Sequence, residues 1–328
     1  MSKQHDNYFI SGASGFIGSN VVSYLINSGI KYSGMSRVEH KDNNISICDL
    51  SDVNIIKKLL KHKTCLVHCA GYAHDFKVTS SKVKSEIWQT NYEGTKNLIK
   101  AAAICGVTKF INLSSVKVYG DVGEEEVGEN YITKPVSEYA KSKLASERFI
   151  IEYGRKHNIN VVNLRLSMVY GDGAKGNLTR MASMIKKKLF PPLPETKNKK
   201  SLVHINDVVE AIFVVSKSPK ATFESFNIVG PTKTSTRNLY NNLREVLGIN
   251  PTKFEISNSI LVFLAKIVDI MQIIFKTKFS FNSDVLKKLM CNENYSSKKI
   301  HEFIGWSPKI KLKEGLLLTY SKNRNLNE

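Results

Sequence analysis

The first half of the chain alternates short, continuously apolar runs with longer segments in which apolar residues recur at helical spacing. Apolar runs bounded by turn residues are typical of buried parallel strands, and the amphipathic segments are typical of the helices that connect them. The alternation therefore predicts an α/β fold built on a Rossmann-like, doubly wound parallel sheet. The strands are expected at residues 7–11, 31–36, 45–48, 64–69, 109–113 and 161–165.

After residue 171 the alternation stops, and helical patterns dominate the rest of the chain. We therefore expect a larger domain at residues 1–170 and a smaller C-terminal lobe at residues 171–200 and 231–328. Residues 201–230 are expected to return partly to the larger domain, with a strand near 226–229 assigned to the smaller lobe.

The most apolar stretch of the chain, residues 260–275, also has helical spacing. Lys266, Asp269 and Gln272 interrupt it, which argues against a membrane span. Its apolar face is wide enough for a dimer partner, a membrane surface or the core of its own lobe. Packing in the core of the lobe is the expectation that we adopt.

Composition places the chain among globular proteins, with 42% hydrophobic and 23% charged residues. The net charge of +19, from 48 basic and 29 acidic residues, is spread as short lysine clusters. Lysine-rich solvated faces are therefore favoured over a specific nucleic-acid site, and RNA binding stays a minor alternative. Five cysteines without a Cys-x-x-Cys pair, and no secretory leader before the first strand, favour a cytoplasmic location.

A glycine-rich turn follows the first predicted strand directly. Gly12, Gly15 and Gly18 have the spacing G-x-x-G-x-x-G, and a helical pattern begins at Phe16 and Ile17. Glycines at such a turn let the backbone approach a pyrophosphate closely and let the helix pack against the strand. The sequence therefore predicts a dinucleotide-binding site here.

The end of the second predicted strand indicates which dinucleotide is bound. Ser36 and Arg37 stand where an acidic residue would bind an adenosine ribose diol. A guanidinium and a hydroxyl suit a 2′-phosphate, so NADP is favoured over NAD. An exposed arginine without a ligand is the simpler alternative.

Further cofactor contacts are expected at the ends of the third and fourth strands. Asp49, followed by Leu50, is placed to accept a hydrogen bond from the adenine amino group. Ala70 and Gly71 are small enough for the cofactor to lie against the strand ends. Cys48, His68, His74 and Asp75 show no metal-ligand spacing, and we predict no metal site.

Tyr139 and Lys143 lie four residues apart in a segment that is typical of a helix, so they share one helical face. A phenol in water ionises near pH 10, and a neighbouring ammonium stabilises its anion. Taken alone, this spacing also fits a solvated helix face. Ser115, at the end of the fifth predicted strand, reaches the edge of the sheet where doubly wound folds bind ligands.

Together these motifs resemble the extended short-chain dehydrogenase/reductase superfamily, in the branch that modifies nucleotide sugars. Other residues that match are Asn91 with Gly94 and Thr95, residues 118–120, Arg165 before residues 169–171, and Gly305 with Trp306. Within the branch, the chain is similar to bacterial UDP-N-acetylhexosamine 4-ketoreductases of the UDP-N-acetylquinovosamine type, and to UDP-sugar 4-epimerases. Such enzymes make sugars for surface polysaccharides, including O-antigen.

The resemblance implies roles for individual residues. Tyr139 would be the general acid/base at the sugar O4, Lys143 and the nicotinamide charge would lower its pKa, and Ser115 would bind the same oxygen. The larger domain would bind NAD(P), with Asn91, Tyr139 and Lys143 among its contacts, and the smaller lobe would be the substrate-binding lobe. The UDP-sugar contacts would be Ser115, Lys117, Asn177 and Lys200, with Lys200 where the family often has a phosphate-binding arginine.

Two departures from the family pattern narrow the expected reaction. Val116 and Lys117 replace the Asp-Glu pair with which sugar 4,6-dehydratases eliminate water, and Met168 replaces an asparagine that contacts substrate. We predict NAD(P)H-dependent reduction of a UDP-4-keto-6-deoxy-N-acetylhexosamine, with a UDP-glucose or UDP-N-acetylglucosamine 4-epimerase as the alternative. A non-catalytic dinucleotide-binding sensor is a third hypothesis, which an intact Tyr139 and Lys143 argue against. The superfamily also implies a homodimer.

Overall fold

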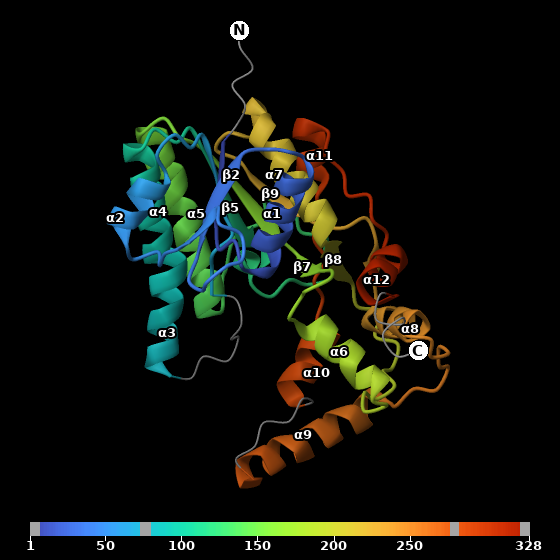
Figure 1. The fold of residues 1–328 in the computed structure, drawn as a ribbon. Helices are drawn as coiled ribbons and strands as arrows, with labels where there is room; N and C mark the ends of the chain where they lie inside the picture. The colour runs from blue at the N-terminus through green and yellow to red at the C-terminus, as the bar shows by residue number, and fades with distance from the viewer. Residues whose placement is uncertain (1–6, 73–79, 276–281, 322–328) are drawn as a thin grey trace.

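The computed structural model describes residues 7–72, 80–275 and 282–321. Seven parallel strands form its central sheet, in the order β3-β2-β1-β4-β5-β6-β9 (Figure 1). The order reverses between β1 and β4, which is the point where doubly wound sheets bind ligands. The predicted Rossmann-like sheet is confirmed. Its strands are β1 (Tyr8–Ser11), β2 (Tyr32–Ser36), β3 (Ile45–Ile47), β4 (Cys65–His68), β5 (Lys109–Ser115), β6 (Asn160–Leu166) and β9 (Ser225–Ile228).

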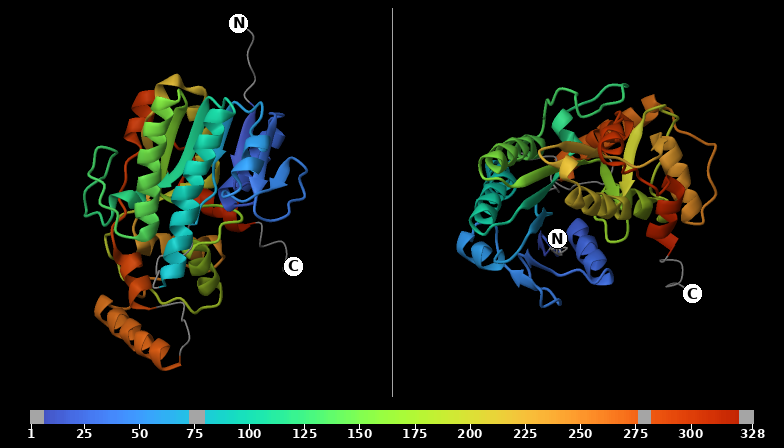
Figure 2. Two further views of the ribbon diagram at one scale, coloured as in Figure 1. Left: turned by 90° about the vertical axis from the view of Figure 1, so that its left-hand side faces the viewer. Right: turned by 90° about the horizontal axis from the view of Figure 1, so that it is seen from above.

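Helices cover both faces of this sheet (Figure 2). On one face lie α1 (Phe16–Asn27) and α7 (Ile205–Lys217); on the other lie α2 (Val53–Leu59), α4 (Gly94–Ile104) and α5 (Glu138–Lys156). All four residues of β1 and of β4 are buried, as expected of strands covered on both faces. Both faces of the sheet are therefore covered. Doubly wound sheets bind ligands at the carboxyl ends of their strands, so a site is expected at that edge.

The assignment of the strand near residues 226–229 to the smaller lobe was wrong. β9 pairs in parallel with β6, with Phe226 opposite Leu164 and Ile228 opposite Leu166. A parallel neighbour needs a long crossover connection, and α7 supplies it by returning the chain to the large sheet. Phe226 and Ile228 are completely buried there.

The smaller lobe is built from segments on both sides of this crossover. Its small sheet, in the order β10-β8-β7, packs with helices that share one apolar core. Its elements are β7 (Met168–Tyr170), α6 (Asn177–Lys186), β8 (Lys200–His204), β10 (Lys233–Thr234), α8 (Thr236–Val246), α9 (Asn258–Phe275), α10 (Ser283–Met290) and α12 (Leu312–Tyr320). Two further helices, α3 (Ser81–Trp88) and α11 (Lys298–Ile304), flank the larger domain.

The prediction that residues 260–275 pack in the core of the lobe holds only for one edge of the helix. Leu261 and Ala265 of α9 are fully buried, but Phe263 and Ile274 are 63% and 66% exposed. The helix reaches beyond the body of the lobe, so that one edge of it contacts the rest of the molecule (Figures 1 and 2). None of the helices in the described part of the chain is long and apolar enough to cross a membrane.

Candidate active site

The loop between β1 and α1 brings a helix N-terminus close to the sheet. Gly12 has a φ of +70°, and a Cβ on it would lie 2.6 Å from the backbone nitrogen of Ala70. A Cβ on Gly18 would lie 2.2 Å from the carbonyl oxygen of Gly12. No side chain caps α1, whose N-cap is Gly15, and an uncapped helix N-terminus favours bound phosphate. The backbone here, through Phe16 and Ile17, fits a dinucleotide pyrophosphate.

The end of β2 carries a cation and no carboxylate. Ser36 is buried, and its Oγ lies 2.7 Å from the Oγ of Ser14, whereas Arg37 is exposed. Asp49 is exposed in the next loop, where hydrogen bonds from Ser51, and then the charge of Arg37, lower its pKa. Leu50 beside it is buried and packs so closely on α4 that a Cβ on Gly94 would lie 2.8 Å from its Cδ1. Leu50 thus anchors the loop that presents Asp49.

Ser115 and Tyr139 meet at the carboxyl edge of the sheet. Ser115 ends β5, and Tyr139 lies in the first turn of α5. A hydrogen bond joins the two side chains. The Ser115 Oγ also accepts from the backbone N–H of Lys117 at 3.2 Å, which fixes its direction. The two hydroxyl groups therefore lie together at this edge of the sheet.

The charge of Lys117 acts on Tyr139, a role that the sequence did not assign to this lysine. Burial raises the pKa of Tyr139, while the hydrogen bond with Ser115 and the charge of Lys117 offset part of the rise. Lys143 instead donates to the carbonyl oxygen of Leu113 at 2.9 Å. Burial lowers the pKa of Lys143 to about 8, against the opposing effect of Glu147. For both groups, the effect of burial on the pKa is therefore larger than the opposing effect of nearby charges.

Asn91 and Gly71 complete the surroundings of Lys143. Asn91 is buried on a π-helical turn (Gln89–Glu93), accepts from the backbone N–H of Tyr72 at 2.7 Å and donates to the Ser142 Oγ at 3.1 Å. A Cβ on Gly71 would lie 3.1 Å from the Lys143 Nζ and 3.3 Å from the Asn91 Oδ1. A side chain at position 71 would press against both polar groups, so glycine is favoured at this strand end, where the sequence predicts the cofactor.

Sequence reasoning missed His68 as a structural partner of this edge. Its Nδ1 lies 2.6 Å from the Ser11 Oγ and its Nε2 lies 2.9 Å from the Thr95 Oγ1. Burial, and then the charge of Lys143, lower the pKa of His68 to about 3, so the ring is neutral. The available signal was a polar residue near the end of an otherwise apolar run.

The two lysines predicted to bind substrate meet on one carboxylate, Glu293. Lys117 forms an ion pair with Glu293, and the Lys200 Nζ lies 3.2 Å from its Oε2. Lys200 is 4% exposed and also donates to the carbonyl oxygen of Lys288 at 2.7 Å. Burial raises the pKa of Glu293, but the charges of both lysines outweigh it and lower the pKa overall. No motif pointed to Glu293.

A model of the NAD dependent epimerase/dehydratase family matches residues 8–229 of this chain. The chain belongs to this family. The match covers the glycine turn, Ser115, Tyr139 and Lys143 together, so the superfamily resemblance drawn from the sequence is confirmed.

Curated relatives align with nearly the whole chain. The UDP-glucose 4-epimerase of Vibrio cholerae is 27% identical, over 97% of this chain and 95% of the relative. The N-acetyl-alpha-D-glucosaminyl-diphospho-ditrans,octacis-undecaprenol 4-epimerase of Escherichia coli O157:H7 is 24% identical, over 95% and 93%. The crystal structure of the Thermotoga maritima UDP-glucose 4-epimerase with UDP-glucose superposes with a TM-score of 0.77, at 23% identity over 98% of this chain and 100% of that one. The structural likeness supports the shared epimerase/dehydratase fold.

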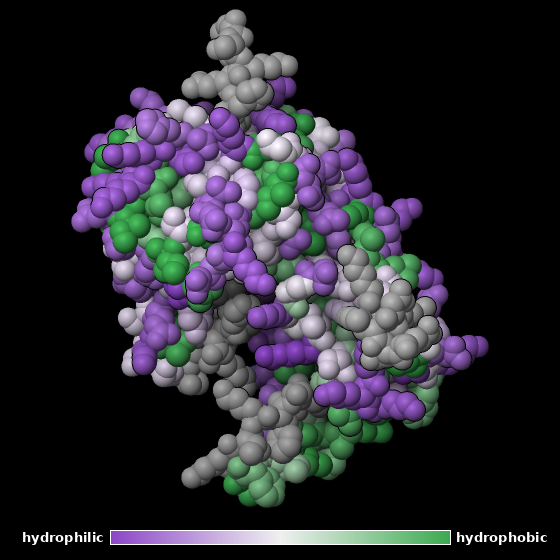
Figure 3. Space-filling view, in the orientation of Figure 1, coloured by the Kyte–Doolittle hydropathy of each residue, from purple (hydrophilic) through white to green (hydrophobic). Residues whose placement is uncertain are grey.

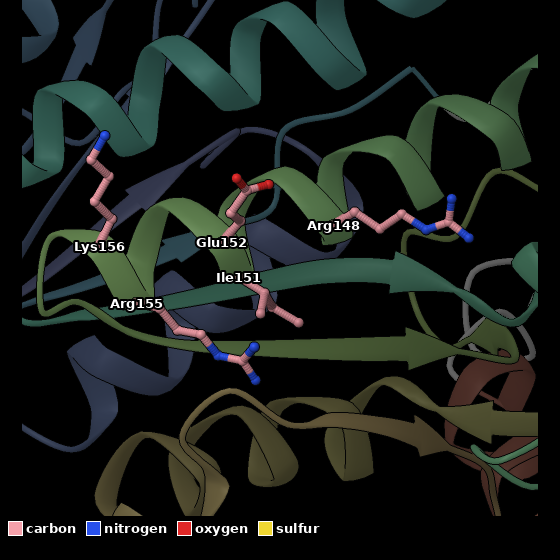
Figure 4. Close-up of a pocket in the computed structure, with 5 residues that line it drawn as sticks. All are labelled: Arg148, Ile151, Glu152, Arg155 and Lys156. Carbon is pink, nitrogen blue, oxygen red and sulfur yellow. The ribbon is translucent and has the colours of Figure 1, made fainter.

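One further candidate position lies on α6, and one surface hollow lies on α5. Asn177 is the exposed first residue of α6. A shallow hollow on the last turns of α5 contains none of the predicted site residues (Figure 4). It is lined by Arg148, Ile151, Glu152, Arg155 and Lys156.

A metal centre finds no support in the described part of the chain, where no three His, Cys, Asp or Glu residues are grouped to hold an ion. His74 and Asp75, which show no metal-ligand spacing in the sequence, lie outside the described residues.

Proposed function

We propose that this enzyme reduces a UDP-4-keto-6-deoxy-N-acetylhexosamine at C4 with NADPH. The observation that carries the proposal is the hydrogen-bonded Ser115–Tyr139 pair at the carboxyl edge of β5. Lys143, Asn91 and Gly71 lie together at the neighbouring strand end, which fits the ribose and nicotinamide end of a dinucleotide. The uncapped α1 fits its pyrophosphate.

Tyr139 donates the proton in this reaction. Its pKa is raised, so the phenol is protonated at neutral pH and can transfer its proton to the sugar O4 as negative charge develops there. Ser115 hydrogen-bonds the same oxygen and holds it within reach of the phenol. When bound, the nicotinamide cofactor supplies the hydride to the sugar C4. A protonated Tyr139 is the state that a reductase needs at the start of turnover.

Arg37 supports NADPH as the cofactor of this NAD-dependent family member. It is the exposed cation directly after β2, in the position of the acidic residue that would bind an unmodified ribose diol. A guanidinium binds a phosphate with paired, charge-assisted hydrogen bonds. We expect a lower KM for NADPH than for NADH.

We propose that Lys117, Asn177 and Lys200 bind the UDP-sugar. The Lys117 side chain is 38% exposed, compared with 5% for Lys200. Lys117 is therefore the cation proposed to contact the sugar beside Ser115. Lys200 contributes to the diphosphate site, and its ammonium is held by Glu293 and the Lys288 carbonyl.

A UDP-glucose or UDP-N-acetylglucosamine 4-epimerase is the second candidate, since both curated relatives named above are 4-epimerases. The same residues would serve it, with Tyr139 first accepting the proton of the sugar O4 and later returning it. Met168, which replaces a substrate-contacting asparagine, and the Ser36-Arg37 pair at the end of β2 are the residues that favour the reductase.

Anaerobic incubation of the purified chain separates the two reactions. UDP-N-acetylglucosamine, UDP-glucose and an enzymatically generated UDP-4-keto-6-deoxy-N-acetylhexosamine are each supplied with NADPH or NADH. Cofactor absorbance and the NMR spectrum of the sugar are then followed together. We expect stoichiometric loss of NADPH with the keto sugar alone. Interconversion of gluco and galacto sugars without net cofactor change would instead establish the epimerase.

A further inference from the structure

Helix α9 exposes an apolar surface that the proposed catalytic site does not use. The helix lies at the tip of the smaller lobe, away from the large sheet (Figures 1 and 2). Leu261 and Ala265 attach it to the apolar core that also contains Ile185 of α6 and Leu286 of α10. Most other large apolar side chains of α9 are exposed.

Eight large apolar side chains of α9 lie side by side around the helix, from the position opposite Leu261 to about 40° from it. At 100° per residue they span an arc of about 140°. The eight, hereafter the apolar arc, are Ile260, Phe263, Leu264, Ile267, Ile270, Met271, Ile274 and Phe275, all between 37% and 66% exposed. Figure 3 shows the corresponding hydrophobic surface at the end of the lobe. A continuous apolar surface of this kind marks an interaction site.

Exposed lysines outnumber exposed carboxylates on α9 and on the two segments next to it, where Lys253, Lys266 and residues 186–188 stand against Glu195 and Glu255. Lys266 lies next to the arc on α9 itself, at its edge on the helical wheel. The segment before α9, with the exposed Lys253, is joined to the segment after α6 by a hydrogen bond from the Ile256 N–H to the Pro192 carbonyl at 3.1 Å. That second segment follows three consecutive exposed lysines at positions 186–188. Acidic groups of α9 do not offset this charge, because Asp269 lies on the inner side and accepts from the backbone N–H of Ser283 at 3.4 Å.

Charge decides between the occupants that this surface could have. A second copy of the chain would bring two sets of these lysines together on molecules that each carry a net charge of +19, which is unfavourable. A membrane with anionic lipids offers phosphates for the lysines and acyl chains for the apolar arc. We infer that α9 docks this protein on an anionic membrane surface, with the helix axis lying in the plane of the interface. Lys266 would then extend its alkyl chain along the arc and place its ammonium among the headgroups.

Vesicle flotation with the full chain tests the inference. The vesicles are phosphatidylcholine alone or phosphatidylcholine with phosphatidylglycerol. We expect the protein to float with the phosphatidylglycerol vesicles, to remain behind with the neutral ones, and to bind more weakly as salt is raised. Equal recovery with both vesicles, or no recovery with either, would overturn the inference.

A matched pair of triple variants locates the contact. Phe263→Gln, Ile270→Gln and Ile274→Gln remove three members of the apolar arc and keep Leu261 and Ala265. Ile26→Gln, Ile104→Gln and Ile132→Gln change three isoleucines with comparable exposure elsewhere. We expect about a tenfold or greater loss of vesicle binding for the first set, by the loss of buried apolar area, and little change for the second. Equal binding by both sets would contradict the role of α9.

A fluorescent probe keeps the test valid if the α9 triple variant does not fold. Phe263→Trp places an indole on the apolar arc, and phosphatidylglycerol vesicles should shift its emission to the blue. An unchanged spectrum would overturn the inference. Light scattering measures whether the chain dimerises. A dimer that depends on the apolar arc, without vesicle binding, would assign this surface to a second copy.

Discussion

The larger domain buries polar side chains at the edge of its sheet, whereas the smaller lobe exposes apolar side chains on α9. At the edge of the large sheet, His68, Asn91 and Lys143 are buried and each is hydrogen-bonded to a neighbouring element. In the lobe, a buried ion pair of Lys200 with Glu293 holds segments together, while the apolar arc of α9 is exposed. We call this hydrogen-bonded edge of the large sheet the fixed frame. In the lobe, the apolar arc is the surface that we propose for contacts with other molecules.

The largest expected effect is at Tyr139, in the fixed frame. Tyr139→Phe removes the proposed proton donor and should lower kcat by about 10²–10⁴-fold, because general acid catalysis contributes that much. Binding of NADPH, followed by its fluorescence, should be unchanged. Tyr153→Phe on the same helix, whose ring stacks on Phe149, is the matched control and should keep kcat. A Tyr139→Phe enzyme with nearly normal turnover would favour the non-catalytic sensor.

Close backbone approach in the same frame is tested by two glycine variants. Gly12→Ala and Gly106→Ala both place a side chain at positive φ, but nothing lies within 4 Å of a Cβ on Gly106. We expect a cost of about 1 kcal/mol for Gly106→Ala and about 1–3 kcal/mol more for Gly12→Ala, which overlaps the Ala70 backbone. Urea unfolding measures both, and NADPH titration should show weakened binding for Gly12→Ala alone. Equal losses would remove the argument for a tight cofactor turn.

Buried Lys143 makes the stability of the frame depend on pH. Its pKa is lowered to about 8 in the folded chain. Between that pH and the ordinary lysine value near 10.4, the unfolded chain binds more protons than the folded chain, so stability rises with pH. Lys143→Met should therefore be more stable relative to wild type at pH 7, by up to about 3 kcal/mol, than at pH 10. A difference in unfolding free energy that is constant with pH would contradict the buried ammonium.

The smallest expected effect concerns Lys200 in the lobe. Lys200→Met leaves Glu293 with one cation fewer and the Lys288 carbonyl without its donor. We expect a loss of about 1–3 kcal/mol in unfolding free energy, because one buried polar partner is removed. Lys199→Met, at the exposed neighbouring position, is the control and should be neutral. A weaker affinity for UDP with unchanged stability would instead assign Lys200 to phosphate binding alone.

The larger domain was predictable because its signals are local. A glycine turn between an apolar run and a helical pattern specifies close packing, and Gly12 and Gly18 show it in the distances to the neighbouring backbone. The Tyr139–Lys143 spacing likewise fixed which side chains share a helical face. Glu293 could not be predicted, because it reaches Lys117 and Lys200 only through the tertiary fold.

Helix α9 shows that apolar spacing predicts a helix but does not predict what covers its apolar face. Its apolar spacing identified a helix, and the structure confirms one at Asn258–Phe275. The same spacing serves a core, a partner or a membrane, because each requires an apolar face. Exposure decides among these, and it depends on how much of the lobe is available to cover the helix. The charge of the neighbouring lysines was visible in the sequence, but its position beside the apolar arc was not.

Transfer of deuterium tests the proposed chemistry most directly. NADPH in which both hydrogens at the nicotinamide C4 are deuterium is mixed with the chain and a UDP-4-keto-6-deoxy-N-acetylhexosamine, and the product sugar is examined by NMR. The Ser115–Tyr139 site predicts one deuterium at the sugar C4 for each NADPH consumed by the wild-type enzyme, and almost none with Tyr139→Phe. Deuterium at another carbon, or wild-type turnover in which the label stays on the cofactor, would contradict reduction at C4.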